Sequence, residues 1–249
     1  MNETVFVIHA SFQPRKLSNA GYDVVYPEAP HVLPMKSTVD IEGQTVQVTN
    51  GGRENARAWF TYNRDDPCDT TESQSGRCIE YVGVEESVNV LAGVLRECSK
   101  GGNGDKEKDD DRDILALIGF SQGGTFAHIL ASLASSARKK SSAKETDAKN
   151  ERNADKIFER IDGVIYIGAF PAKHSPQEGS ACHPRLDQSL ETKSLHVIGK
   201  SDTSVCPDLS RNLAALFDET KIYQHEKGHL VPTNSASCEV LIGFLGALC

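Results

Sequence analysis

Three residue types that act together in nucleophilic catalysis occur in this chain in the order serine, aspartate, histidine. Ser121 lies in Gly119-Phe120-Ser121-Gln122-Gly123, a G-x-S-x-G pattern, and Asp202 and His229 follow it. A serine hydroxyl is a weak nucleophile until a base accepts its proton, and that base needs an acid to orient it. The three residues therefore predict acyl-transfer chemistry, in which Ser121 attacks the carbonyl carbon of an ester or a thioester.

The serine lies between two predicted elements. An unbroken apolar run, Ile114 to Ile118, is typical of a strand buried on both faces of a parallel sheet. A helix is predicted over 122–137, directly after the serine. A strand that reverses straight into a helix strains the backbone at Ser121, and side chains at 119 or 123 would clash there. We therefore expect the hydroxyl to project at the carboxyl end of the sheet.

The predicted acid and base both follow strands. Asp202 comes after a strand predicted at 194–198, and His229 lies between the last strand and the final helix. Sites in open α/β sheets form on such loops, at the carboxyl ends of the strands. His225 competes for the role of base, but it has less freedom because it is a strand residue. His128 is expected to be structural, and so is His9, although the loop of His9 faces the site.

The reaction would need hydrogen-bond donors for the charge that develops on the carbonyl oxygen. The backbone N–H of Gln122 is one predicted donor of this oxyanion hole. The loop after the first strand, Thr4 to Ile8, is predicted to supply the other. Ser11 is the favoured residue there, with Ala10 and Phe12 as alternatives.

Strands and helices alternate along the chain, which predicts an α/β fold with a doubly wound, mostly parallel sheet flanked by helices, in a single domain of residues 1–249. Further strands are predicted at 22–26, 161–168 and 221–225, and further helices at 86–98, 207–218 and 235–247. The first crossover is short, because only a stubby helix around 15–20 fits between the first two strands.

Two charged segments, 99–113 and 135–155, are predicted to be exposed inserted loops. The first is rich in glycine and aspartate. The second contains almost no apolar residue, so it cannot bury enough surface to fold alone, and we expect helix only at its ends.

Residues 31–80 are predicted to be irregular because they are rich in Pro, Gly, Asn, Asp and Thr. They contain the single tryptophan, Trp59, next to Phe60. These aromatic side chains, with Phe120, are predicted to bind the acyl part of the substrate. The alternative for Trp59 and Phe60 is that they anchor the long loop to the core.

Composition narrows the partners and the compartment. The chain has 249 residues, 38% of them hydrophobic, which suits one domain with a sizeable core. A net charge of −8 disfavours a nucleic-acid partner. No apolar run is long enough to span a membrane, and the N-terminus does not resemble a signal peptide. The seven scattered cysteines predict free thiols and a cytoplasmic location, rather than a zinc site or a disulfide framework.

Several motifs together resemble the FSH family of serine hydrolases. They are GFSQGG at the serine, GKSDTSVCP around Asp202, KGHLVP around His229, RAWF at 57–60 and YVGVEESVNVL at 81–91. The resemblance implies the α/β-hydrolase fold, in which the order Ser, Asp, His is the expected one. It also implies an esterase activity on acyl or alkyl esters, with some thioesterases, and no metal or organic cofactor. It supports Ser121, Asp202 and His229 as the triad.

The chain departs from the family pattern after its first strand. The family usually has His-Gly there and then a full helix, whereas this chain has His9-Ala10 and the short crossover. We hypothesise that the first part of the helix is lost, by deletion or through a mis-drawn coding sequence. The alternative function is therefore a binding or scaffold protein with the same fold and with weak or lost hydrolysis.

Overall fold

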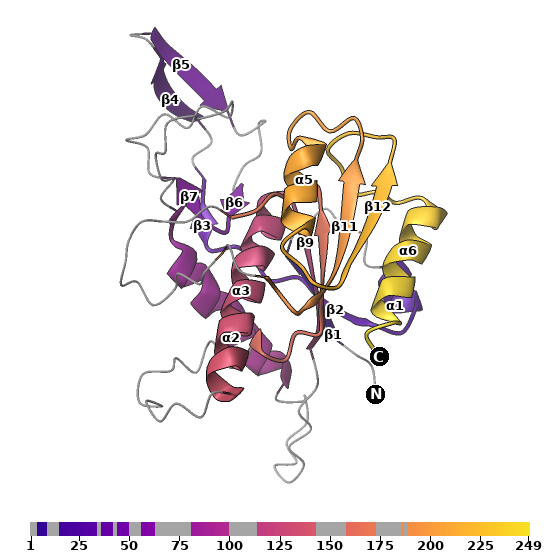
Figure 1. Ribbon diagram of the computed structural model, residues 1–249. Helices are drawn as coiled ribbons and strands as arrows, with labels where there is room; N and C mark the ends of the chain where they lie inside the picture. Colours follow the sequence, from indigo (N-terminus) through magenta and orange to yellow (C-terminus); the bar gives the residue numbers. More distant parts are fainter. Residues whose placement is uncertain are drawn as a thin grey trace.

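A six-stranded sheet forms the centre of the molecule (Figure 1). The structure is a computed structural model that describes residues 4–8, 15–33, 36–41, 44–49, 56–62, 81–99, 114–142, 158–172, 186 and 189–249. The strands of the sheet are β1 (Thr4–Ile8), β2 (Asp23–Val25), β9 (Ile114–Phe120), β10 (Gly163–Ile167), β11 (Lys193–Gly199) and β12 (Thr220–His225). All neighbouring strands are parallel, in the order β12-β11-β10-β9-β1-β2. The predicted parallel sheet is confirmed.

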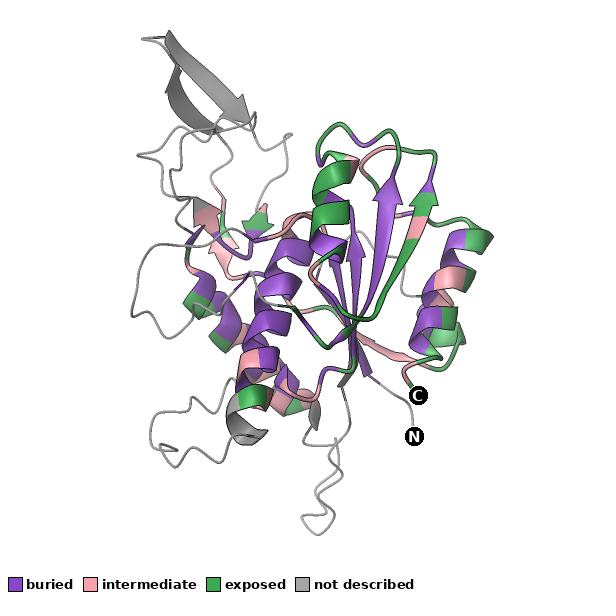
Figure 2. Ribbon diagram, in the orientation of Figure 1, coloured by how far each residue is buried: buried purple, intermediate pink, exposed green. Residues whose placement is uncertain are grey.

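Helices cover both faces of this sheet. One face packs against α2 (Val84–Ser99), α3 (Gln122–Ser142) and α5 (Pro207–Ala214), and the other against α1 (Arg15–Asn19) and α6 (Ser235–Leu245). All residues of β1 and β10 are buried, which explains their continuous apolar sequences. The buried residues follow the strands and the helix sides that face them (Figure 2).

The first crossover is as short as predicted. Helix α1 has five residues, and Leu17 is its buried residue. Gly21 then turns the chain into β2 with a φ of +94°, a conformation that glycine adopts readily. The described part of this crossover is therefore a one-turn helix that lies on the same face of the sheet as α6.

The prediction that residues 31–80 are irregular is wrong for the part that the structure describes. This region contributes β3 (His31–Val32), β4 (Lys36–Ile41), β5 (Gln44–Thr49), β6 (Arg57–Ala58) and β7 (Thr61–Tyr62). Antiparallel pairs join β3 to β6, β4 to β5, and β7 to β8 (Tyr81–Val82). The four strands of two residues are too short to show a periodicity.

The insert from Ser135 begins with helix, as expected for its ends, because α3 continues to Ser142. The prediction that it is exposed is wrong for the first residues of this stretch. Ser135 and Ala137 are buried. Arg138 donates from its Nε to the Glu159 carbonyl at 3.1 Å and from its Nη2 to the Ile161 carbonyl at 2.8 Å. The polar composition therefore concealed that this end of the helix is partly buried and is bonded to the chain entering β10. The rest of this insert, 143–155, and residues 100–113 of the other lie outside the described residues.

No helix in the described ranges is both long and apolar enough to cross a bilayer.

Candidate active site

Ser121 lies at the sharp turn between β9 and α3. Its φ is +52°, and it is the only non-glycine residue of the described chain with a positive φ. The backbone N–H of Ser121 donates to the Ile167 carbonyl at 3.0 Å, and the N–H groups of Gly124 and Thr125 donate to the Ser121 carbonyl at 2.9 and 3.1 Å. These bonds hold the serine in a conformation that L-residues rarely adopt.

The glycines around the serine are required by close contacts. A Cβ atom on Gly119 would lie 2.5 Å from the Gly124 Cα, and one on Gly123 would lie 2.0 Å from the Ile8 carbonyl oxygen. Both distances are shorter than any allowed contact. The turn therefore packs directly against the end of β1, and side chains at 119 and 123 would clash, as the sequence predicts.

Asp202 and His229 form a hydrogen-bonded pair at the ends of β11 and β12. His229 Nδ1 lies 2.7 Å from Asp202 Oδ2. The Asp202 side chain is only 2% exposed, and its Oδ1 accepts hydrogen bonds from the backbone N–H groups of Ser204 and Val205 at 2.9 and 2.8 Å. A carboxylate held in this way keeps the proton of a neutral imidazole on Nδ1 and leaves the Nε2 lone pair free to act as a base.

The end of β10 connects this pair to the serine. Ile167 binds Ser121 through its carbonyl, and the next residue, Gly168, has a φ of +50°. A Cβ atom on Gly168 would lie 3.1 Å from His229 Nδ1 and 3.3 Å from Asp202 Oδ2. Gly168 was not among the residues predicted from the sequence, although a glycine at the end of a buried strand is the signal that could have identified it.

Phe120 contacts the imidazole from the serine side. Its ring centroid lies 4.6 Å from that of His229, with the ring planes inclined by 33°. Phe120 immediately precedes Ser121 in the chain. The structure thus brings the predicted serine, aspartate and histidine to one edge of the sheet.

The side chain of Gln122 fixes the segment that carries the predicted substrate-binding aromatic residues. Its Oε1 accepts from the Trp59 N–H and its Nε2 donates to the Phe60 carbonyl, both at 3.0 Å. Trp59 is 5% exposed and stacks on Phe126 at 4.8 Å, and Phe60 is completely buried. The geometry supports the alternative interpretation, in which these two aromatic residues anchor a loop to the core.

The structure describes one of the two predicted oxyanion donors. Gln122 is the first residue of α3, where backbone N–H groups have no acceptor within the helix. Ser11 and its alternatives, Ala10 and Phe12, lie outside the described residues, so the second donor stays a prediction.

The competing histidines have other partners. His225 Nδ1 accepts from the Lys227 N–H at 3.2 Å, and burial, with a smaller contribution from the Lys227 charge, lowers the pKa of His225. His128 Nδ1 accepts from the Ala172 N–H at 3.1 Å, and burial lowers the pKa of His128 to about 4. Both geometries favour structural roles.

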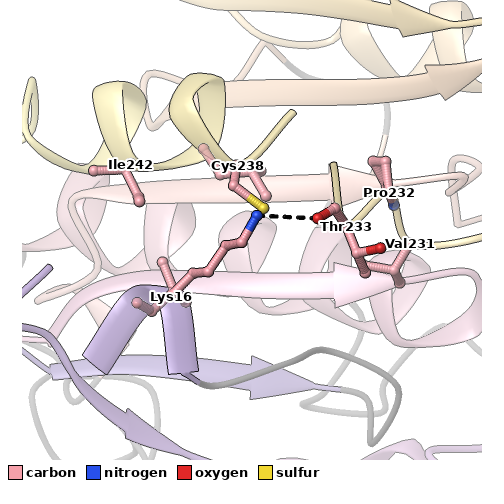
Figure 3. A pocket seen from close by; sticks show the side chains of 8 residues that line it. Lys16, Val231, Pro232, Thr233, Cys238 and Ile242 are labelled. Carbon is pink, nitrogen blue, oxygen red and sulfur yellow. Dashed lines mark hydrogen bonds between the residues drawn. The ribbon is translucent and has the colours of Figure 1, made fainter. Parts of the chain in front are cut away.

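One interaction that the sequence did not suggest joins the first crossover to the loop after His229. Lys16 Nζ donates to the Thr233 carbonyl at 3.1 Å (Figure 3). The side chains around this bond enclose a pocket of only about 10 Å³, lined by Lys16, Leu17, Val231, Pro232, Thr233, Cys238, Leu241 and Ile242. The pocket is too small for an ester substrate, but the bond links α1 to the loop that carries the histidine.

Comparisons with known proteins place the chain in a family. A family model described as "Serine hydrolase (FSH1)" matches residues 2–240. The esterase OVCA2 of Danio rerio is 24% identical over 246 residues, which cover 93% of this chain and 86% of that protein. An esterase of Aedes aegypti is 23% identical over 232 residues, which cover 92% of this chain and 66% of that protein.

Solved structures show the same fold. The Bacillus cereus carboxylesterase superposes with a TM-score of 0.51 at 14% identity, covering 100% of this chain and 89% of that one. Acyl-protein thioesterase 2 of Zea mays superposes with a TM-score of 0.50 at 13% identity, covering 99% and 94%. The architecture around the serine turn is therefore that of the α/β hydrolases.

Proposed function

Because this chain belongs to the FSH1 family of serine hydrolases, we propose that it cleaves carboxylic esters or thioesters through a triad of Ser121, His229 and Asp202. The observation that carries the proposal is the 2.7 Å bond between His229 and Asp202, on the same sheet edge as the strained Ser121. A serine, an imidazole and a buried carboxylate in this arrangement are what acyl transfer requires.

In the first half of the reaction, Ser121 Oγ attacks the carbonyl carbon and its proton passes to His229 Nε2. The carbonyl oxygen becomes an oxyanion, which accepts a hydrogen bond from the Gln122 N–H and a second one from the loop after β1, where Ser11 is the expected donor. Each such donor lowers the barrier by about 3–4 kcal/mol.

The tetrahedral intermediate then collapses to an acyl-enzyme. The carbon–oxygen or carbon–sulfur bond to the leaving group breaks, and His229 returns its proton to the departing alcohol or thiol. In the second half, His229 takes a proton from water, the hydroxide attacks the acyl carbon, and the carboxylic acid leaves as Ser121 regains its proton. Asp202 stabilises the imidazolium in both halves.

A fluorophosphonate probe tests this mechanism, because it reacts only with an activated serine. We expect the wild-type protein to be labelled and the Ser121→Ala variant not to be. The matched control is Ser18→Ala, since Ser18 is an exposed serine on α1. Labelling that survives in Ser121→Ala would overturn the assignment of the nucleophile.

The alternative function is a binding or scaffold protein, and the five-residue α1 is the observation that favours it. A short crossover leaves little chain to shape the second half of an oxyanion hole. A folded wild-type protein that the probe does not label would support this alternative. A labelled protein should next be assayed against nitrophenyl esters and acyl-CoA thioesters of increasing acyl length, which would identify the substrate class.

The substrate class and the cellular location stay predictions. A small-molecule ester follows from the family, and a cytoplasmic location rests on the scattered cysteines. Fractionation of cells that express a tagged full-length chain would test the location.

A further inference from the structure

The imidazole of His229 is in contact with three different parts of the chain. Asp202 binds its Nδ1 at 2.7 Å. The backbone at Gly168 approaches so closely that a Cβ atom there would lie 3.3 Å from the imidazole Cε1. The ring of Phe120, at 4.6 Å, is the only aromatic side chain that the described structure places against the imidazole.

The position of Phe120 gives its ring a role distinct from substrate binding. Phe120 is half-buried at the end of β9, and it packs against the apolar cluster on the α6 face of the sheet. The face of an aromatic ring carries partial negative charge and attracts a cation within about 6 Å of the ring centre. The His229 ring lies within that range, and it gains a positive charge each time it takes a proton.

We propose that Phe120 is a positioning residue for His229, whose ring orients the imidazole and stabilises the imidazolium that forms when Ser121 loses its proton. This inference rests on the proposed function, because it assigns to His229 the role of base. It differs from the sequence-based prediction, which placed Phe120 against the acyl chain of the substrate.

Within the described structure, Asp202 is the charged group that contacts the imidazole, through the 2.7 Å bond to Nδ1. On the neighbouring loops, Lys200 and Glu226 pair with each other at 2.6 Å on the surface, and His225 accepts a hydrogen bond from the Lys227 N–H. A change at Phe120 removes none of these groups, so the difference between variants reports the aromatic ring.

The test compares Phe120→Leu, which keeps an apolar cover but removes the aromatic ring, with Phe120→Tyr, which keeps the ring. NMR titration of the His229 imidazole in the resting protein measures the effect directly. We expect Phe120→Leu to lose roughly threefold in proton affinity at His229, and Phe120→Tyr to recover most of that loss.

Steady-state kinetics provide the second measurement. Phe120→Leu should lower kcat three- to tenfold with KM unchanged, and Phe120→Tyr, which keeps the ring, should lose less of kcat than Phe120→Leu. If Phe120→Leu does not fold, Phe120→Met removes the ring with a more flexible side chain and serves the same purpose.

Two results would overturn the inference. One is an imidazole titration that is the same in wild type, Phe120→Leu and Phe120→Tyr. The other is a rise in KM that grows with acyl length and leaves kcat unchanged, which would mean that Phe120 binds substrate. A wild-type protein without fluorophosphonate labelling would instead refute the proposed function, while the titration would still decide whether the ring stabilises the imidazolium.

Discussion

His229 lies at the rim of the sheet, whereas His128 and His196 lie in the core, both near the ring of Phe217. The side chain of His229 is 20% exposed and is bonded to a carboxylate. His128 and His196 are no more than 1% exposed, and within the described structure His128 Nε2 and His196 Nδ1 have no hydrogen-bond partner. A histidine at the rim can therefore pair its charge with a carboxylate. A histidine in the core has no such partner and must stay neutral.

The core histidines belong to a compact cluster of rings. His196 stacks on Tyr166 at 4.8 Å, and Phe217 lies 5.5 Å from His196 and 6.4 Å from His128. Burial lowers the pKa of His128 to about 4 and, with a smaller contribution from His128, that of His196 to about 3. Burial also raises the pKa of the Tyr166 hydroxyl far above its usual range. Every titratable group of the cluster is thus held in its neutral form.

The largest expected effect separates the two environments by activity. His229→Ala should lower kcat by a factor on the order of 10⁴–10⁶, since it removes the base that accepts the serine proton. His196→Phe should leave kcat within about threefold of the wild-type value, because His196 lies in the core, away from the serine. Ester hydrolysis by the purified variants measures both. A His229→Ala protein with a tenth of the wild-type kcat would place the base elsewhere.

The second prediction concerns stability in acid. The folded pKa values of His128 and His196 lie below the ordinary value of about 6.5, so below pH 6.5 the unfolded chain binds protons that the folded chain does not. The free energy of unfolding should therefore fall as the pH is lowered from 6.5 toward 4. We expect a loss on the order of 2 kcal/mol for each histidine between pH 7 and pH 4.5, measured by urea unfolding.

His196→Phe should remove about half of this pH dependence, because His128 is then the remaining core histidine that gains a proton on unfolding. Rings of similar size make the substitution tolerable for packing. An unchanged slope in His196→Phe would mean that groups outside the cluster cause the acid sensitivity.

A smaller effect is expected where the chain touches the imidazole at the rim. Gly168→Ala places a methyl group 3.1 Å from His229 Nδ1 at a φ of +50°, so we expect kcat to fall by about 10- to 100-fold through displacement of the ring. Gly93→Ala is the matched control, because Gly93 lies in α2 with no atom within 4 Å of the added Cβ. Equal kcat values for the two variants would show that the contact at Gly168 does not position His229.

The smallest effect is expected at His225, which lies between the two extremes. His225→Gln should change kcat by less than about threefold, because the buried imidazole at 225 binds backbone rather than substrate. The pH–rate profile should also be unchanged. A loss of more than 100-fold would instead identify His225 as the base and would remove the contrast with His229.

Much of this arrangement could be predicted from the sequence, because a parallel sheet brings the carboxyl ends of all its strands to one edge. Ser121, Asp202 and His229 each follow a predicted strand, and the structure gathers them at that edge. Their catalytic roles stay predictions. Strands β9 and β11 and helix α6 begin within one residue of the expected positions, because each contains a clear stretch of apolar residues.

The parts that could not be predicted depend on single long-range contacts. Arg138 donates to the backbone carbonyls of Glu159 and Ile161, about twenty residues further along the chain, which a polar composition does not indicate. The backbone of Trp59 and Phe60 is bonded to the side chain of Gln122, and both aromatic rings are buried. No local sequence pattern indicates this long-range contact. The hairpin of β4 and β5 did have a signal, because β-branched residues recur in both strands and only two residues separate them.

The bond between Gln122 and Trp59 has one further consequence. Since Trp59 is the only tryptophan of the sequence, all indole emission comes from a ring stacked on Phe126, one turn along the helix that begins at Gln122. Its wavelength and its quenching by acrylamide therefore report, without any attached dye, how tightly the chain closes beside the nucleophile.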